Sequence, residues 1–172
     1  TEVKVKFSND KTVDATVVGS DEYADIAVLS VDKDSIISVA NIGKSESMRV
    51  GDTTFAVGAP IDSDTFSWTV TRGILSGKNR IVETEDSIMQ VLQTDTAINS
   101  GNSGGPLCDS NGEVVGVTNM KLASTAVEGM GFAIPIEIVN TLLERLESGQ
   151  KIERPIIGVE MTDISNTYYL YR

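Results

Sequence analysis

A serine stands in the middle of a glycine-rich turn, Gly-Asn-Ser-Gly-Gly-Pro, at residues 101–106. A serine hydroxyl becomes an effective nucleophile when a neighbouring base takes its proton. Attack on a carbonyl also builds negative charge on the carbonyl oxygen, which backbone N–H groups in a tight glycine turn can stabilise. Ser103 is therefore the candidate nucleophile. The turn Gly101–Asn102–Ser103 is the candidate oxyanion hole, with the N–H groups of Gly101 and Ser103 as its donors.

The base that this chemistry needs is missing. It is usually a histidine, and the 172 residues contain none. An isolated G-x-S-G-G also leaves open an ordinary glycine hairpin in which Ser103 is a plain turn residue. Here the pattern is longer, because Asp95 and Ala97 precede it and Pro106 and an Asn-Gly hairpin follow it. The longer pattern favours the catalytic interpretation.

The chain carries 25 acidic and 14 basic side chains, which gives a net charge of −11. Affinity for nucleic acid depends largely on clustered basic side chains, and anionic lipid surfaces also attract basic segments. The charge balance therefore argues against both partners. One cysteine, Cys108, excludes a disulfide within these residues, and its place in Pro-Leu-Cys predicts a buried, unreactive thiol.

Short apolar or alternating segments recur along the chain and predict strands. They lie at residues 3–7, 13–17, 25–31, 53–58, 67–75, 87–94, 112–120 and 131–134, and the segment 25–31 is predicted to be buried. Many short strands predict an all-β fold, a barrel or a sandwich. One helix is predicted over residues 135–150, with an apolar stripe that packs on the barrel.

Four stretches together resemble the trypsin-like serine proteases of the HtrA (DegP, Do-like) group. They are "QTDTAINSGNSGGPL" at 93–107, "GFAIPIEIV" at 131–139, "GSDEYADIAVLSV" at 19–31 and "TRGILSG" at 71–77. The resemblance covers nearly the whole chain in the order of the family. An unrelated β-barrel with a chance GNSGGP would require all four to coincide.

The resemblance implies a double antiparallel β-barrel with the active site between the barrels. Residues 1–40 would be the latter part of an incomplete first barrel, and residues 41–134 a complete second barrel that carries the nucleophile. Residues 135–150 would be a C-terminal helix. Residues 151–172 would be a linker and the beginning of a PDZ domain.

The resemblance assigns roles to two residues that lie 78 positions apart. Ser103 is similar to the nucleophile, and Asp25 is similar to the carboxylate that orients the histidine and stabilises its charged form. Taken alone, Asp25 would be a strand-start residue that makes a local turn bond. In this family the histidine lies shortly before the strand that residues 1–7 resemble. The expectation is that the chain starts after it and that these residues alone are inactive.

The resemblance also implies a specificity. Trypsin-like enzymes that cut after Lys or Arg carry an acid six residues before the serine, where this chain has Ala97 followed by Ile98. A small apolar pocket is therefore expected. Asn102 replaces the acid that captures a newly cut N-terminus, so activation by that route is not expected.

Loops around the site switch HtrA-like proteases, and the segments 76–87 and 121–130 lie where those loops are expected. Arg80 is the candidate sensing residue, although a solvated arginine in a polar loop is the common case. A PDZ-like loop that receives a peptide carboxylate through backbone N–H groups is expected at the four residues Ile156, Ile157, Gly158 and Val159.

The implied function is a serine endopeptidase that degrades unfolded or misfolded proteins through an acyl-enzyme, in protein quality control and the stress response. The alternative is a catalytically inactive, trypsin-like module that binds peptides or acts as a chaperone. No metal or organic cofactor is implied. The intact protein is expected to be a homotrimer, membrane-anchored and outside the cytoplasm, as the family implies.

Overall fold

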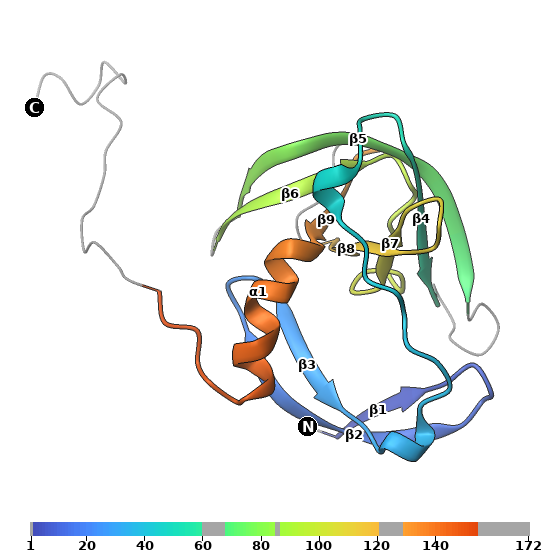
Figure 1. The fold of residues 1–172 in the computed structure, drawn as a ribbon, viewed down its shortest axis with the longest axis vertical. Coiled ribbons are helices and arrows are strands. Elements are labelled where there is room, and N and C mark those ends of the chain that lie inside the picture. Colours follow the sequence, from blue (N-terminus) through green and yellow to red (C-terminus); the bar gives the residue numbers. More distant parts are fainter. Residues whose placement is uncertain (1, 60–67, 85–86, 121–128, 155–172) are drawn as a thin grey trace, which may run out of the picture.

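The computed structural model of the chain describes residues 2–59, 68–84, 87–120 and 129–154. These residues form a three-stranded sheet, a closed six-stranded barrel and one α-helix (Figure 1). The sheet has the order β1–β2–β3 and contains β1 (Val3–Lys6), β2 (Thr12–Asp21) and β3 (Ile26–Ser30). All its strand pairs are antiparallel.

The barrel closes in the order β4–β5–β6–β9–β8–β7, again with antiparallel pairs. Its strands are β4 (Thr53–Gly58), β5 (Thr69–Glu83), β6 (Ile88–Thr94), β7 (Pro106–Cys108), β8 (Val114–Thr118) and β9 (Gly131–Pro135). Two short 3₁₀ turns, Lys33–Ser35 and Ser45–Ser47, lie on the segment that leads from the sheet to the barrel. The helix α1 spans Ile136–Glu147 and follows β9 directly.

The barrel interior is apolar and includes one set of buried hydroxyls. Leu75, Leu107 and other fully buried side chains fill it. Thr54, Thr94 and Thr96 lie beside them, and their hydroxyl oxygens are 2.7 to 2.9 Å apart. A buried polar group needs a hydrogen-bond partner, and these three provide one another with partners. The cluster also fixes the chain just before the glycine turn, because Thr96 N–H donates to the Thr94 hydroxyl.

Helix α1 joins the sheet to the barrel. It contacts β2 and β3 on one side and β8 and β9 on the other, as Figure 1 shows. Leu146 is fully buried, and Gly19 of β2 lies so close to the carbonyl of Leu146 that a side chain at residue 19 would collide with it. The apolar stripe therefore packs on more than the barrel, the only surface that the sequence predicted for it.

Strand β3 differs from its prediction as a buried strand. Its residues alternate between half-buried and exposed, and Leu29 is 42% exposed. The physical reason is its position: among the described residues it pairs with β2 along one edge and packs against α1. A continuous apolar run indicates a strand, but it does not show how many faces are covered.

The segment that begins at Ser76 was predicted to be a loop, and for residues 76–83 this is wrong. Strand β5 continues through them to Glu83 and pairs with β6, with register shifts at Gly77 and Arg80. The polar and glycine residues of this stretch suggested a loop. Cross-strand pairing and two irregularities accommodate them in a long hairpin instead.

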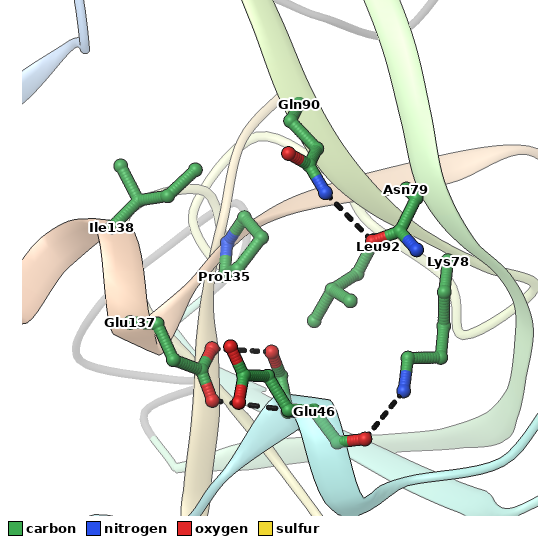
Figure 2. A pocket seen from close by; sticks show the side chains of 9 residues that line it. Glu46, Lys78, Asn79, Gln90, Leu92, Pro135, Glu137 and Ile138 are labelled. Atoms are coloured by element: carbon green, nitrogen blue, oxygen red, sulfur yellow. Dashed lines mark hydrogen bonds between the residues drawn. The ribbon is translucent and has the colours of Figure 1, made fainter.

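The segment between the sheet and the barrel is anchored at the start of α1. The Glu137 carboxylate accepts hydrogen bonds from the Ser45 hydroxyl at 2.5 Å and from the Glu46 N–H at 3.3 Å. Opposite it, the Lys78 ammonium donates to the backbone carbonyls of Glu46 and Met48. Glu46, Lys78 and Glu137 line a cavity of about 350 Å³, and Figure 2 shows their side chains around it.

The residues that line this cavity do not include those of the glycine turn that carries Ser103. Strand β9 pairs with β8 so that Ala133 is opposite Thr118 and Pro135 is opposite Gly116. Thr118 accepts the hydrogen bond from the N–H of Gly104, whereas Pro135 lines the cavity.

Within the described ranges, no helix is long and apolar enough to cross a membrane.

We expect Glu137→Gln to lower the free energy of unfolding by about 1 kcal/mol near neutral pH, because hydrogen bonds to a charged acceptor are stronger. Burial acts to raise the pKa of Glu137, but the hydrogen bonds from Ser45 and Glu46 outweigh it, and the pKa lies below its ordinary value. A lowered native pKa gives stability that is present above the unfolded pKa of about 4.3 and lost as the pH falls through the native pKa.

Urea unfolding at neutral pH and at about pH 3 measures this difference. The gap between wild type and Glu137→Gln should shrink in acid. Glu144→Gln, at an exposed position on the same helix, should show little effect at either pH. An equal gap at both pH values would contradict the expectation.

Candidate active site

The glycine turn lies between β6 and β7 and presents Ser103 at the surface. The carbonyl of Asn99 accepts hydrogen bonds from the N–H groups of Asn102 and Ser103, at 3.2 and 3.3 Å. Further along, Gly104 has a positive φ of 83° and donates its N–H to Thr118 at the end of β8. Hydrogen bonds within the turn therefore close it around the Asn99 carbonyl, and the Gly104 N–H attaches it to β8 of the barrel.

Glycines allow the turn to sit directly on the end of β4. A Cβ at Gly105 would collide with the carbonyl oxygen of Val57, and one at Gly58 would collide with the backbone of Asn102. The N–H of Ala59 donates to the carbonyl of Gly101 at 3.0 Å. Backbone therefore packs on backbone here, which only residues without a side chain permit.

One of the two predicted oxyanion donors is engaged inside the turn. The N–H of Ser103 donates to Asn99 at 3.3 Å, a length beyond the usual range for an N–H···O bond. To stabilise a developing oxyanion, this N–H would have to turn away from Asn99. The other predicted donor, Gly101, has a φ of 109°, in the region that favours glycine.

The side chain of Asn102 holds the turn from within. It is 3% exposed, and its Oδ1 accepts the N–H of Asn99 while its Nδ2 donates to the carbonyl of Ala97. Both ends of the amide are thus used locally. This geometry is in keeping with the expectation that Asn102 does not capture a charged N-terminus.

The two residues predicted to form the specificity pocket lie directly before the turn. Ala97 is exposed, and its carbonyl also accepts a hydrogen bond from the Thr71 hydroxyl. Ile98 is half-buried and packs against the barrel core. A Cβ at Gly131 would come within 2.7 Å of the Ile98 side chain, so the start of β9 lies beside it. The groups gathered here are apolar and small.

Asp25 lies in the turn between β2 and β3, on the three-stranded sheet. It is exposed and has a positive φ of 55°, a conformation that Asp tolerates better than most residues. Its Oδ2 accepts a hydrogen bond of 3.0 Å from Nδ2 of Asn119. The next residue, Met120, donates its N–H to Oγ of Ser103, also at 3.0 Å.

The two residues that directly follow β8 therefore contact the candidate carboxylate and the candidate nucleophile. This brings Asp25 and Ser103 close together, although one lies in a turn of the three-stranded sheet and the other in a turn of the barrel. Asn119 is 3% exposed, and its own N–H donates to Phe132 of β9. Its position is fixed by the barrel.

Asn119 is the site residue that the sequence did not reveal. The stretch 112–120 indicated only a strand. The sequence offered two clues: an amide side chain stands at the end of an apolar strand, where a buried residue is expected, and the glycine turn needs a neighbouring strand to cover it. Which strand would cover it depends on pairing, and pairing is not visible in one sequence.

The remaining candidates lie elsewhere. Arg80 lies on the β5–β6 hairpin and hydrogen-bonds to Gln93. The buried Cys108 has a pKa raised chiefly by burial, with the charge of Asp109 adding to it, as an unreactive thiol requires. The loop candidates at 121–128 and the four residues 156–159 lie outside the described residues. In the part that is described, no group of three His, Cys, Asp or Glu is placed to hold a metal ion.

Comparison with known proteins identifies the family. Residues 1–117 match the trypsin-like peptidase domain. The chain belongs to this family of trypsin-like peptidases. Within it, the chain is 44% identical to the serine protease Do-like HtrA of Bacillus subtilis over 174 residues, which cover 99% of this chain and 38% of that protein. It is also 44% identical to its counterpart in Lactobacillus helveticus, over 99% of this chain and 42% of the relative.

Solved structures agree with these relatives. The HtrA-type protease AlgW with a decapeptide superposes with a TM-score of 0.77 at 33% identity, over 87% of this chain and 45% of AlgW. AlgW with a tripeptide gives a TM-score of 0.75 at 33% identity, over 87% and 49%. The trypsin-like, double-barrel HtrA fold is therefore confirmed. The chain spans about two fifths of the length of the relatives named above.

We expect Asn102→Ala to destabilise this trypsin-like domain by about 2 kcal/mol, because it leaves the Asn99 N–H without its acceptor and removes one of the two hydrogen bonds to the Ala97 carbonyl. Urea unfolding measures the loss. Asn111→Ala is the matched control, since the Asn111 amide bonds to Asp109 in an exposed hairpin turn. Equal losses in the two variants would show that the Asn102 amide does not hold the turn.

Proposed function

We propose that this chain supplies the nucleophile, the orienting carboxylate and the substrate-binding residues of a serine endopeptidase that cleaves unfolded or misfolded proteins. The observation that supports the proposal is a pair of hydrogen bonds from two consecutive residues, Asn119 to Asp25 and Met120 to Ser103. The family relationship supports the same chemistry.

In this mechanism Oγ of Ser103 attacks the carbonyl carbon of the scissile peptide, and a base takes the hydroxyl proton. Met120 donates to Oγ, so the hydroxyl keeps its own proton available for that base. Asp25, held by Asn119, orients the base and stabilises its charged form. The base returns the proton to the leaving amine, and water then hydrolyses the acyl-enzyme. These 172 residues contain no histidine, so we assign the base to a histidine elsewhere in the natural protein.

Substrate peptides would bind beside Ala97 and Ile98, whose small apolar surface suits a side chain such as Val or Ala before the cleaved bond. The titles of the AlgW structures name bound peptides, a decapeptide and a tripeptide, which supports a peptide ligand for this chain. We further propose that the turn at 99–103 changes conformation on binding, so that the Ser103 N–H leaves Asn99 and reaches the oxyanion.

The intact protein is proposed to be a homotrimer, anchored in the membrane and acting outside the cytoplasm in protein quality control. A peptide carboxylate is proposed to bind at residues 156–159, and Arg80 is proposed to transmit the activating signal. These proposals rest on the resemblance to HtrA proteases.

The second candidate function is a catalytically inactive module that binds peptides or acts as a chaperone. Two observations favour it: the absence of histidine from these residues and the engagement of the Ser103 N–H within the turn. It retains the peptide-binding surface and dispenses with the acyl-enzyme.

The test is digestion of β-casein by the natural protein, including the residues that precede Thr1. The wild-type protein is compared with its Ser103→Ala variant. We expect the substitution to abolish cleavage, a loss of at least about a thousandfold. Ser110→Ala, in an exposed hairpin turn, should cleave as wild type does. A folded wild-type protein that leaves casein intact would favour the peptide-binding module.

A further inference from the structure

A bidentate ion pair ties the segment after α1 to the three-stranded sheet. Nη1 and Nη2 of Arg154 donate to Oδ1 and Oδ2 of Asp21, at 2.6 and 2.5 Å. Asp21 is the last residue of β2, and its side chain is 7% exposed, against 33% for Arg154. The arginine holds the pKa of the Asp21 carboxyl below its usual value. A buried carboxylate without its partner is costly, so this pair is not an ordinary surface contact.

The same guanidinium also stacks on an aromatic ring. The Arg154 guanidinium carbon lies 4.4 Å from the centre of the Tyr23 ring. The Tyr23 hydroxyl donates to the carbonyl of Ile88 at 3.0 Å and accepts the Ile88 N–H at 3.1 Å. Ile88 is the first residue of β6 and therefore belongs to the long β5–β6 hairpin. Arg154 thus reaches the barrel through one aromatic side chain.

Asp21 acts on the turn that carries Asp25. Its Oδ2, which accepts from Nη2 of Arg154, also accepts the N–H of Ala24 at 3.1 Å. Ala24 is 4% exposed, and the next residue is Asp25 with its positive φ. An ion pair on Asp21 therefore fixes the position of the residue that precedes the candidate catalytic carboxylate.

We propose that Arg154 is a positioning residue for the active site: together with Asp21, Tyr23 and Ile88 it forms a latch that fixes the Asp25 turn and joins it to the β5–β6 hairpin. The segment that follows α1 then controls the orientation of the carboxylate from outside the site. The kinetic part of this inference rests on the proposed protease function, whereas the structural coupling does not. Ion pairing and cation–π stacking both require a planar guanidinium, so lysine is not an equivalent residue.

The experiment uses the full-length natural protein and two readouts. The first is hydrogen exchange of backbone amides in the peptides that contain residues 21–25 and Ile88, measured in the Ser103→Ala background so that cleavage plays no part. Arg154→Met should speed exchange about tenfold at both places. Tyr23→Phe keeps the ring but removes the hydroxyl, so it should speed exchange at Ile88 and leave residues 21–25 protected.

The second readout is the steady-state kinetics of peptide cleavage. Arg154→Met should lower kcat about tenfold with KM unchanged, because a misplaced Asp25 weakens an interaction made mainly in the transition state. Arg154→Lys should rescue it only in part. The double variant Asp21→Asn with Arg154→Met removes both charges, so it should regain thermal stability but not kcat.

The matched control is Lys4→Met. Lys4 lies on β1 of the same sheet and forms exposed ion pairs with Glu2 and with Asp14 of β2, which the substitution removes. It should change neither readout. Unchanged exchange at residues 21–25 in Arg154→Met would overturn the latch. Recovery of kcat in step with thermal stability would overturn the positioning role. A full-length protein that cleaves nothing would refute the proposed function, and the exchange pattern would still decide the latch.

Discussion

The candidate active site depends on the two residues that follow β8, Asn119 and Met120. A carboxylate on one sheet and a hydroxyl on a barrel turn can cooperate only if something fixed lies between them, and here Asn119 and Met120 do. Asn119 is itself set by the barrel, since its N–H bonds to Phe132 of β9. The pairing of β8 with β9 therefore fixes the barrel side of the site. The three-stranded sheet that carries Asp25 must be held against the barrel by other contacts. Helix α1 does this by packing on both bodies, and Gly19 allows the close approach.

The residues with chemistry could be recognised from the sequence because they are local. The GNSGGP turn and the helical stripe are each contained in a few consecutive residues, and their physical requirements are visible there, whereas the roles of Ala97, Ile98 and Asp25 came from the resemblance to the family. Asn119 was missed because its role comes from strand pairing. The extent of β5 was missed for a related reason: glycine and polar residues predict a loop locally, but cross-strand hydrogen bonds can keep them in a strand. The exposure of β3 depends on which elements pack on its two faces, and the pattern of apolar residues along one strand does not show this.

The glycine turn shows how stability and reactivity can oppose each other. Asn102 and the carbonyl of Asn99 satisfy the buried polar groups of the turn, and the Ser103 N–H takes part in that network. An oxyanion hole needs unpaired donors aimed at a place where charge develops, and such donors are unfavourable until substrate arrives. The long Ser103–Asn99 bond is the weak member of the set, so it is the one whose loss costs least. The Asn102 side chain can stay in place while that N–H turns outward.

The backbone of Asp25, with its positive φ, is held in a conformation that few residues adopt. A positive φ persists only where surrounding contacts determine it. Toward the barrel, one hydrogen bond from Asn119 fixes the side chain. Toward the chain start, the Ala24 N–H is bonded to Asp21, and Asp21 in turn to Arg154. Removing the second set leaves the Asp25 side chain with its hydrogen bond to Asn119, and leaves the turn held at its base by the pairing of Asp21 with Ile26. In the proposed latch, the orientation of the candidate carboxylate depends on a residue 129 positions further along the chain, which would give the segment after α1 a physical means of acting on the site.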